Sequence, residues 1–555
     1  MRLKFGLVLL AVALSFAAPP KLLVPNAVTD VYRPLPLDTQ KLSGLLAERM
    51  RANSEGFLEH TDKNLLTSEG GQESSAAAQE QAGYFLNAGS TAYDYTRDGK
   101  LRGVIDRIAG QILADIHARG KAQNCELNGS ACRHTLLGLL AYYRVTGNED
   151  ALAGSRQLAD FLISNRLRSP GLIEPMIYLY RRTSENRYLD FAKSSVGNQI
   201  VDPAVMRVAT AEMLSYLAGE VQLYRVTGDQ SYLKRAVATW QEQAANRLSV
   251  TGTLSTSSVD EPASDCLTVS WLQLTLELLR VTGDARYADQ LEKTVYNQLL
   301  AGQDPRTGDL CPAVGISGRK TWSADPAACA SEEARGIALI PALVWGRYEN
   351  GIAVNFYTAG RGTAILRHRR GTIQLYSEAT FPETGQISLH VEPDHTIQFP
   401  LRLRVPQWVG HFTADIDGSH LVGAPGTYMN ISREWKRGDT VKIQMDLPVH
   451  TITRNANSTA EIALQRGPQV LALGNRLNPE LTDLSAASLP DAAVKPTLGQ
   501  ATNNLPSSWA SDQAYSIDGL YRGKQQKLTF IPFADAISYR VWLRKFDVKQ
   551  AVATY

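Results

Sequence analysis

The chain has 555 residues, of which 44% are hydrophobic and 20% charged, and its formal net charge is +2. This length is too great for one ordinary hydrophobic core, so we expect three or four domains. The composition carries no signature of disorder, and the scattered Lys and Arg residues argue against nucleic acid as a partner.

The first 18 residues have the pattern of a secretory signal peptide. MRLK is basic, the apolar run FGLVLLAVALSFAA follows, and Ala17 and Ala18 are small residues before Pro19. An N-terminal membrane anchor is the alternative, although the apolar run is short for a membrane-spanning helix. We predict removal of residues 1–18, export to the periplasm or the extracellular space, and no membrane span in the mature protein. Residues 19–40 are then an N-terminal extension.

A short motif recurs after this extension. Its copies are YYRVTGNEDAL (142–152), YLYRRTSENRYL (178–189), LYRVTGDQSYL (223–233) and LLRVTGDARY (278–287), with a weaker copy that starts at Tyr93. Apolar residues recur at helical spacing on both sides of each turn. In the last copy, Gly283 can adopt the left-handed conformation that ends a helix, and Asp284 can cap the next one. Each copy therefore predicts two helices joined by a tight turn.

The copies are unequally spaced along the chain. Their shared threonines are Thr96, Thr146, Thr183, Thr227 and Thr282. An open solenoid that grew from one repeat tends to keep a constant period, whereas a closed ring can carry loops of different lengths on one rim. We therefore favour an (α/α)6 toroid barrel over residues 41–345, with an open solenoid as the alternative.

Residues after Trp345 have the pattern of β-strands. Short β-branched and partly alternating runs include IAVNFYT (352–358), FPLRLRVPQW (399–408) and DTVKIQMDLPVHTITR (439–454). We predict a β-sandwich over 346–455 and a C-terminal β-rich region over 456–555. Within the latter, residues 475–515 are rich in Pro, Ser, Asn and Ala and are predicted to be a linker.

The chain has five cysteines: Cys125, Cys132, Cys266, Cys311 and Cys329. An exported protein can form disulfides, but the odd number leaves at least one thiol unpaired. A disulfide between Cys125 and Cys132 would close a short loop. The pairing as a whole does not follow from the sequence.

The segment CLTVSWLQLTLELLRVTGDARYADQLEKTVYNQLLAGQDPRTG (266–308) resembles the central part of the β-L-arabinofuranosidase family of glycoside hydrolases, family 127. ARGIALIP, WGRYENGIAVNFY, FPLRLRVPQW, REWKRGD and IALQRGP resemble later motifs of that family, in the same order. LLGLLAYYRVTG resembles a motif of its early barrel. The resemblance covers most of the mature chain and implies a helical toroid followed by β-sandwiches. It also implies action on, or binding of, arabinose-containing or related plant-type glycans.

The resemblance further implies a cysteine-based mechanism. In the family, a cysteine thiolate attacks the anomeric carbon, and water later hydrolyses the glycosyl-enzyme intermediate. A zinc ion lowers the pKa of the thiol, and a glutamate acts first as acid and then as base. The zinc ligands are a glutamate two residues before a cysteine, that cysteine, and an adjacent cysteine pair whose first member is the nucleophile.

This sequence departs from that pattern. Cys266 matches the first cysteine, but the residue two positions before it is Ser264 instead of glutamate. The adjacent cysteine pair corresponds to Ala328 and Cys329, so the resemblance puts an alanine at the nucleophile position. An alanine methyl group cannot attack the anomeric carbon.

The two remaining cysteines of this pattern, Cys266 and Cys329, have two possible roles. They could bind zinc, with Asp265 or His134 completing the ligand set, because two thiolates with an oxygen or imidazole ligand are chemically acceptable. Alternatively, they form a disulfide or stay free thiols. We favour this second reading, since an exported protein that has lost two zinc ligands can oxidise the remaining cysteines.

The acid/base position is changed as well. Within the loop VTGTLSTSSVDEP it corresponds to Ser258, three residues before Glu261. Glu261 could take the catalytic role if the loop shifts, and Asp265 is a second candidate in the same segment. Either carboxyl could act as general acid or base if burial raised its pKa toward neutrality. The alternative is a solvated loop carboxylate without a catalytic role.

Four residues are candidates for contact with the sugar: His134, Glu174, Glu212 and Trp271. His134 aligns with a barrel-lining position of the family, and Glu174 with an acid that faces the barrel interior. Glu212 is retained near a position where relatives carry a histidine, which is Ala209 here. The alternatives are a surface histidine, a structural hydrogen bond for Glu174, and core packing for Trp271.

Three functions remain open. A modified glycoside hydrolase would need two carboxylates that face each other across the opening of the barrel. A non-catalytic carbohydrate-binding descendant would keep a polar, aromatic-lined pocket without such a pair. A scaffold of a surface assembly would show a large apolar patch and no deep pocket. We rank hydrolase ancestry first and leave turnover open.

Overall fold

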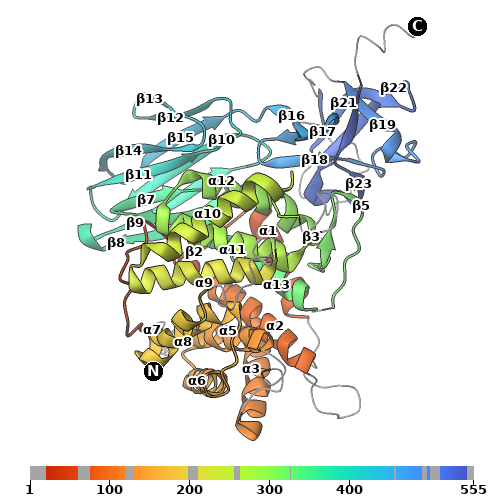
Figure 1. Cartoon of the computed structure of the whole chain (residues 1–555). Helices are drawn as coiled ribbons and strands as arrows, with labels where there is room; N and C mark the ends of the chain where they lie inside the picture. The colour runs from red at the N-terminus through yellow and green to blue at the C-terminus, as the bar shows by residue number, and fades with distance from the viewer. Residues whose placement is uncertain are drawn as a thin grey trace, which may run out of the picture.

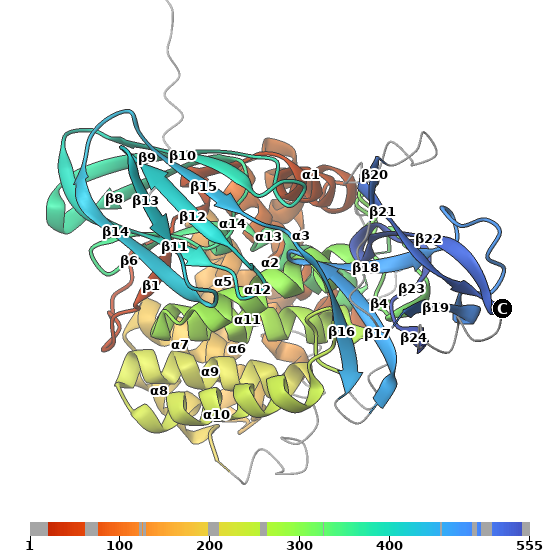
Figure 2. The same ribbon diagram turned by 90° about the horizontal axis from the view of Figure 1, so that it is seen from above.

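The computed structural model describes residues 20–60, 76–120, 125, 129–197, 210–255, 263–325, 327–455, 458–490, 497–500 and 513–546. A helical body precedes two regions built from strands (Figure 1). Seen from above, the larger β region and the smaller C-terminal β region lie at opposite ends of one side of the helical body (Figure 2). Within the described ranges, none of the helices has the length and apolar character needed to cross a bilayer. The predicted signal peptide, residues 1–18, lies outside these ranges.

The helical body is a closed double ring. The inner helices are α2 (Ala76–Thr96), α5 (Gly129–Thr146), α7 (Ile173–Thr183), α9 (Ala211–Thr227), α11 (Asp265–Thr282) and α13 (Ala328–Ala338). Each inner helix contacts the next, and α13 contacts α2. The outer helices are α3 (Gly99–Arg119), α6 (Glu149–Ser164), α8 (Asn186–Ser194), α10 (Gln230–Arg247), α12 (Ala285–Thr294) and α1 (Leu45–Arg51). The contact between α13 and α2 closes the ring, which confirms the toroid over the open solenoid.

The recurrent motif forms the turn to the outer partner at five of the six inner helices, α2, α5, α7, α9 and α11. The Thr282 hydroxyl donates to the carbonyl of Leu278 at 2.7 Å and accepts the N–H of Asp284 at 3.2 Å. The Asp284 carboxylate then caps α12 by accepting the N–H of Arg286 at 3.0 Å. Gly283 has φ +67° between them, as the end of α11 requires. The threonine therefore recurs because one hydroxyl satisfies polar groups of two helices.

These tight turns lie at the C-terminal ends of the inner helices. The connections back from outer to inner helices are longer, and their described parts include residues 248–255 and 263–264 before α11 and 300–325 before α13. They lie at the N-terminal ends of the inner helices. This end of the barrel therefore carries the elaborated rim that the unequal repeat spacing predicts.

The N-terminal extension is part of the folded core. Its strand β1 (Tyr32–Pro34) pairs with β6 (Trp345–Tyr348), and β2 (Gln40–Leu42) pairs with β8 (Gly360–Leu366). Before β1, the extension passes over the C-terminal ends of the inner helices, where the N–H groups of Leu23 and Val28 donate to the carbonyls of Arg181 and Arg225. The extension thus closes the barrel at the end opposite the elaborated rim.

Two sheets follow the helical body. The first has the strand order β1-β6-β7-β11-β14, with β7 (Gly351–Val354), β11 (Ile397–Val405) and β14 (Thr427–Trp435). The second has the order β13-β12-β15-β10-β9-β8-β2, with β9 (Gly371–Ala379), β10 (Gln386–Pro393), β12 (Phe412–Ile416), β13 (Ser419–Val422) and β15 (Asp439–Met445). Trp345 of the first sheet packs against Gly362 of the second. This packing gives the predicted β-sandwich.

The C-terminal region is a third sheet that closes on itself. Its ring is β17 (Ser458–Arg466), β24 (Leu543–Phe546), β19 (Ala487–Pro490), β21 (Gln513–Tyr521), β22 (Lys524–Pro532) and β18 (Gln469–Gly474). The ring closes because β18 also pairs with β17. Four strands extend this sheet: β16 (Val449–Asn455), β20 (Thr497–Gln500), β23 (Ser538–Arg540) and β5 (Ser317–Arg319).

The prediction of a linker over residues 475–515 is wrong. The segment contains β19 and β20, and its last residues begin β21. β19 pairs with β21 and β24, which come later in the chain. Short strands of this kind are stabilised by distant partners, so the local composition gave no signal for them.

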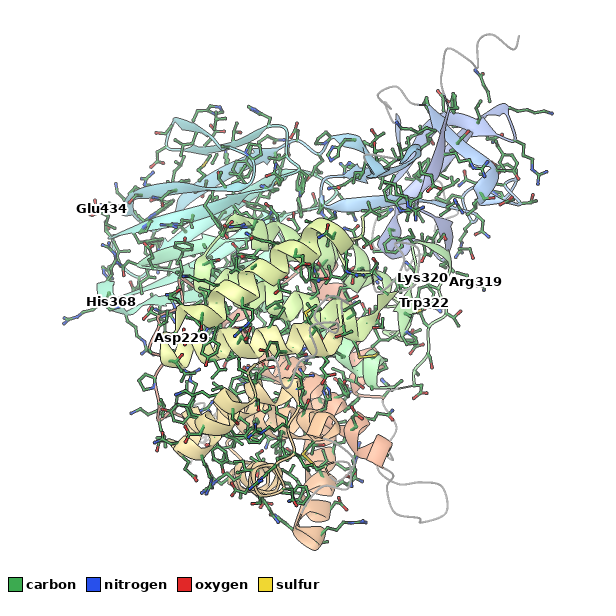
Figure 3. All side chains as sticks on the ribbon, viewed as in Figure 1. Asp229, Arg319, Lys320, Trp322, His368 and Glu434 are labelled. Atoms are coloured by element: carbon green, nitrogen blue, oxygen red, sulfur yellow. A yellow bond between two sulfur atoms is a disulfide. The ribbon has the colours of Figure 1, made fainter. Side chains whose placement is uncertain are left out.

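The C-terminal region is joined to the helical body through buried polar contacts. Lys320 directly follows β5, next to the C-terminal region (Figure 3). Its Nζ donates to the carbonyls of Phe533 at 2.7 Å and Ala534 at 3.0 Å. Arg49 of α1 pairs with Asp535 at 2.7 Å. Both cations are buried and need these oxygens, so the contacts fix how the two regions dock.

Candidate functional site

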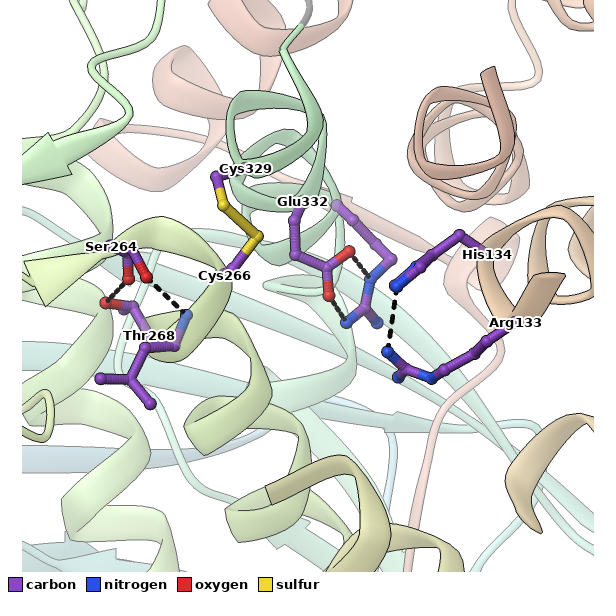
Figure 4. Close-up of a disulfide and its surroundings, with 9 residues drawn as sticks. Arg133, His134, Ser264, Cys266, Thr268, Cys329 and Glu332 are labelled. Carbon is purple, nitrogen blue, oxygen red and sulfur yellow. Dashed lines mark hydrogen bonds and ion pairs between the residues drawn. A yellow bond between two sulfur atoms is a disulfide. The ribbon is translucent and has the colours of Figure 1, made fainter. Parts of the chain in front are cut away.

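The two cysteines considered as zinc ligands, Cys266 and Cys329, form a disulfide. Cys266 lies in the first turn of α11, and Cys329 lies in the first turn of the adjacent inner helix α13 (Figure 4). Their Cα atoms are 4.9 Å apart and the two sulfur atoms are bonded. The disulfide is half-buried, and Ala328 precedes Cys329 directly. Both sulfurs are therefore engaged, as in the disulfide alternative. The second predicted disulfide, Cys125–Cys132, is also present.

The changed position Ser264 has a structural role. Its hydroxyl accepts the N–H of Leu267 at 3.3 Å and caps α11. Its carbonyl accepts the Thr268 hydroxyl at 3.3 Å (Figure 4). A serine at this position therefore starts the helix instead of serving a metal.

The described residues around the disulfide do not fit a zinc ion. They contain no group of three or more His, Cys, Asp and Glu side chains with the arrangement that a metal needs. Of the two predicted extra ligands, His134 stacks on Tyr84 and Asp265 lies against Glu333. With the thiols oxidised and these side chains engaged elsewhere, the zinc prediction has no complete donor set.

His134 lies deeper in the barrel, on α5. Its ring stacks on that of Tyr84 with centroids 3.4 Å apart, and its Nε2 lies 3.3 Å from Nη1 of Arg133 (Figure 4). Because a guanidinium group can only donate, Nε2 accepts in this contact. Burial and the charges of Arg133 and Arg335 hold the pKa of His134 well below its usual range. The imidazole is therefore neutral and oriented, which suits contact with a hydroxyl group.

Four side chains form a polar belt across the barrel interior: Glu174, Gln273, Arg335 and Glu332. Gln273 donates to Glu174 at 2.8 Å and accepts from Nη2 of Arg335 at 2.8 Å. Arg335 also forms two hydrogen bonds with Glu332, at 2.9 and 2.5 Å. The belt joins α7 to α11 and α13, and burial raises the pKa of Glu174. It confirms that Glu174 faces the interior.

The sequence analysis missed Arg133, Gln273 and Arg335. All three lie on inner helices, within three turns of the N-terminal end where the cysteines lie. This shared position near the helix starts was the sequence feature that could have identified them as site residues. However, the sequence does not show which face of an apolar helix a single polar residue occupies.

Asp265 lies in the first turn of α11, next to Cys266. It is buried and lies against Glu333, whose carboxyl lies directly against Gly302. This pair faces the segment before α13, whereas Glu332 points into the barrel. Burial raises the pKa of Asp265 to about 7. The shifted pKa resembles that of a general acid, but the side chain is only 2% exposed.

The other residues that the sequence analysis proposed for the site lie in different environments. Glu212 is exposed in the first turn of α9, where it accepts from the Ser169 hydroxyl at 3.3 Å. Trp271 is fully buried and stacks on Trp240 of an outer helix, with ring centroids 5.2 Å apart. Its predicted sugar contact is wrong, and core packing is its role. Glu261, Ser258 and Ala209 lie outside the described residues.

The rim at the N-terminal ends of the inner helices, marked by Ser264, Cys266, Cys329 and Glu212, is called the barrel mouth below. Below the mouth lie the neutral His134 and the polar belt. Such groups can donate hydrogen bonds to, and accept them from, a bound hydroxylated molecule. Among the described residues of the mouth, Cys266 and Cys329 offer no thiolate, because their sulfur atoms are bonded to each other.

Comparison with known proteins agrees with this architecture. The sequence profile described as "Beta-L-arabinofuranosidase, GH127 catalytic domain" matches residues 73–333, and that of the "GH127 middle domain" matches residues 351–447. The chain belongs to the GH127 family. The two matched segments correspond to the helical barrel and to the β-sandwich.

A curated relative in this family is the non-reducing end beta-L-arabinofuranosidase of Bifidobacterium longum subsp. longum. It is 23% identical over 435 residues, which is 62% of this chain and 65% of the relative. The match therefore spans less than two thirds of that protein's length.

Solved GH127 structures have the same fold. One, described as a GH127 beta-arabinofuranosidase, has a TM-score of 0.79 at 18% identity and covers 94% of this chain and 99% of its own. A GH127 beta-L-arabinofuranosidase from Geobacillus stearothermophilus T6 has a TM-score of 0.74 at 19% identity, covering 91% and 100%. At these identities the likeness establishes the toroid followed by β-sandwiches, and no more than that.

Proposed function

We propose that this protein is an exported GH127-family protein that binds arabinose-containing plant-type glycans at the barrel mouth and does not hydrolyse them through a cysteine. One observation carries this proposal: the disulfide between Cys266 and Cys329, next to Ala328. A sulfur atom within a disulfide has no thiolate lone pair with which to attack an anomeric carbon. An alanine beside it supplies no replacement.

The interior below the mouth supports binding. His134 is neutral, held in place by stacking, and close to the Arg133 guanidinium. Glu332 and Arg335 neutralise each other's charge, so their remaining hydrogen-bonding capacity suits an uncharged sugar better than an ion. Aromatic stacking and fixed polar groups are a common basis of small-molecule recognition.

A second candidate function is hydrolysis by carboxylates. It is favoured by the exposed Glu212 on α9, which neighbours α11, the helix preceded by the loop that contains Glu261. Two carboxylates at the mouth could serve as acid and base for an inverting reaction. In that case the cysteines are structural and Glu261 carries the chemistry.

One experiment separates these functions. The purified protein is incubated with an aryl β-L-arabinofuranoside, and binding of an arabinose-containing oligosaccharide is measured by calorimetry. We expect binding without turnover, and at least tenfold weaker binding for His134→Ala. His117→Ala, at a half-exposed histidine of α3, is the matched control and keeps the affinity of the parent.

Turnover that is lost in Glu261→Gln and kept in Cys329→Ala would overturn the proposal in favour of the carboxylate mechanism. Neither turnover nor binding would overturn both functions. Export is tested separately: N-terminal analysis of the protein recovered outside the cytoplasm should give a chain that begins at Pro19.

A further inference from the structure

A cavity lies at the end of the barrel opposite the mouth. It has a volume of about 430 Å³ and is lined by the C-terminal halves of the inner helices and by the N-terminal extension. Leu35 and Leu37 of the extension close one side, and Leu276 and Leu339 of α11 and its neighbour form part of the wall. Arg144 also lines it and is exposed, so the cavity reaches the surface there. It is called the lower cavity below.

The lower cavity is distinct from the barrel mouth. Glu174, Gln273 and Arg335 of the polar belt line it, but Cys266 and His134 do not. Because these belt residues are hydrogen-bonded to one another, the belt separates the two spaces. A molecule in the lower cavity would meet the belt from the side opposite the disulfide.

Several polar groups in the lower cavity have unused hydrogen-bonding capacity. Gln222 of α9 is only 4% exposed, and its side-chain amide has no hydrogen-bond partner among the described residues. The same is true of the Tyr178 hydroxyl and the Asn87 amide. Oε2 of Glu174 is fully buried without a partner. The Gln222, Tyr178 and Asn87 groups border the cavity, so their unused hydrogen-bonding capacity is available to a bound polar molecule.

The lower cavity also carries unpaired positive charge. Within the part of the chain that the structure describes, Arg181 and Arg182 line the cavity and have no carboxylate within ion-pair distance; Arg181 donates to the carbonyl of Val24 at 3.4 Å, and Arg182 to that of Pro20. Arg144 has only a long contact of 3.6 Å with Asp94. A ligand anion would neutralise this group.

Arg280, in contrast to Arg181 and Arg182, is paired with carboxylates. Arg280 lines the same cavity, but Asp30 and Glu277 hold its guanidinium at 2.8 and 3.2 Å. Its charge is therefore compensated within the protein. The uncompensated positive charge is confined to the surface side of the cavity, near the N-terminal extension.

We propose that the lower cavity binds a small polyhydroxylated anion, of the chemical class of a monosaccharide carboxylate. The ligand hydroxyls face the unpaired amides of Gln222 and Asn87 and the Tyr178 hydroxyl, which can each donate and accept. The ligand carboxylate faces Arg181 and Arg182. The leucine side chains contact the C–H groups of the sugar ring. The volume lies within the range of ligand pockets and accommodates one such molecule.

Calorimetry with the purified protein tests this proposal. The probes are D-galacturonate and D-glucuronate, with neutral D-galactose and L-arabinose and with acetate as comparisons. We expect one uronate site, at least tenfold weaker in Gln222→Leu and in the double variant Arg181→Gln/Arg182→Gln. Acetate and the neutral sugars should bind at least tenfold more weakly than the uronates.

Two matched controls are available. Gln243→Leu changes another buried glutamine, on the outer helix α10, and Arg187→Gln changes a surface arginine that pairs with Asp160 and Glu185. Both should keep the uronate affinity. The arginine double variant alters partly exposed side chains, so it remains informative if Gln222→Leu fails to fold.

Absence of uronate binding, or equal affinity in the parent and the arginine variant, would overturn the proposal. Acetate binding as tightly as the uronates would reduce the site to a simple anion site and would also overturn it. Loss of uronate binding in His134→Ala would place the ligand at the barrel mouth instead. Because these readouts do not depend on arabinose-containing glycans, this proposal and the proposed function fail independently.

Discussion

At the scale of single residues, the most unusual chemistry lies behind the disulfide. Asp265 and Glu333 are two buried carboxyls in contact, and two ionised carboxylates cannot share such a site. Burial raises the pKa of Asp265 to about 7 and, together with Asp265, raises that of Glu333 well above its ordinary value. Lys320 and the Cys311 thiol are their other titratable neighbours.

This pair predicts that stability falls as the pH rises from about 4 to 7. In that range the native chain keeps a proton on Asp265 that the unfolded chain has lost, so each step up in pH favours unfolding. The stabilisation is complete below the unfolded pKa of 3.8. The neutral His134 shifts stability in the opposite direction below pH 6.5. The contribution of the carboxyl pair, on the order of 2–4 kcal/mol in the free energy of unfolding, is therefore measured as the difference between the parent and Asp265→Asn in urea denaturation at pH 4.5 and 7.

Asp265→Asn should flatten this dependence, because an amide can donate to Glu333 without binding a proton. Asp190→Asn, at an exposed position of α8, serves as the matched control and should keep the slope of the parent. A slope that Asp265→Asn leaves unchanged would show that this carboxyl is ionised in the native protein.

The cysteines give a second prediction at this scale. With Cys125–Cys132 and Cys266–Cys329 bonded, Cys311 is the cysteine that remains free. Thiol titration of the unreduced, denatured protein should therefore find one thiol per chain. Three thiols, together with one bound zinc per chain by elemental analysis, would support the zinc alternative and contradict the disulfide between Cys266 and Cys329.

At the scale of elements, the barrel is set by its turns. Gly147, Gly228 and Gly283 end inner helices with positive φ, and each is followed by a residue whose side chain caps the next helix. Gly283 has an additional constraint: a Cβ there would lie 2.5 Å from the Tyr348 hydroxyl, where β6 approaches the turn. Gly147 has the same backbone conformation, with open space around it.

These two glycines form a matched pair. Gly147→Ala should cost about 1–2 kcal/mol of the free energy of unfolding, from backbone strain alone. Gly283→Ala should cost about 1–3 kcal/mol more, because the methyl group also collides with Tyr348. Equal costs in thermal denaturation would mean that Tyr348 moves aside freely and that the docking of the strand does not constrain the turn.

At the scale of the whole molecule, the buried guanidinium group of Arg404 joins the β-sandwich to the barrel. Arg404 of β11 pairs with Asp289 of α12 at 2.5 Å and with Glu292 of the same helix. Trp408 also donates to Glu292 at 2.8 Å. Arg404 and Trp408 are more than 110 residues from Asp289 and Glu292 in the sequence, so their pairing depends on the docking of the two domains.

Arg404→Leu should destabilise the protein by about 3–5 kcal/mol, because it leaves two buried carboxylates without their cation. Arg433→Leu removes an arginine of the same sandwich whose partner Asp417 is exposed, and should cost less than about 1 kcal/mol. The free energies are compared by chemical denaturation. Similar costs for the two variants would indicate that the interface around Arg404 is hydrated.

The sequence alone was sufficient to predict the helical hairpins and the family, but it predicted the residues of the site less completely. The turn motif at Thr282 and Gly283 acts within a few residues, so its pattern predicts the local structure directly. Cys266, Ala328 and Cys329 were identified as the decisive positions because the family motifs keep their order. Trp271 was assigned wrongly, since only the neighbouring Trp240 decides that its face of α11 points outward.

By itself, the sequence determined the local elements and the order of the domains, and it predicted an alanine at the nucleophile position. The tertiary structure decided whether the ring closes, that Cys266 meets Cys329, that Glu174 meets Gln273 and Arg335, and that the N-terminal extension encloses a lower cavity. The physical reason is the range of the interactions. Turns and caps join neighbours in the chain, whereas burial, ion pairing and disulfide formation join residues that only the folded barrel brings together.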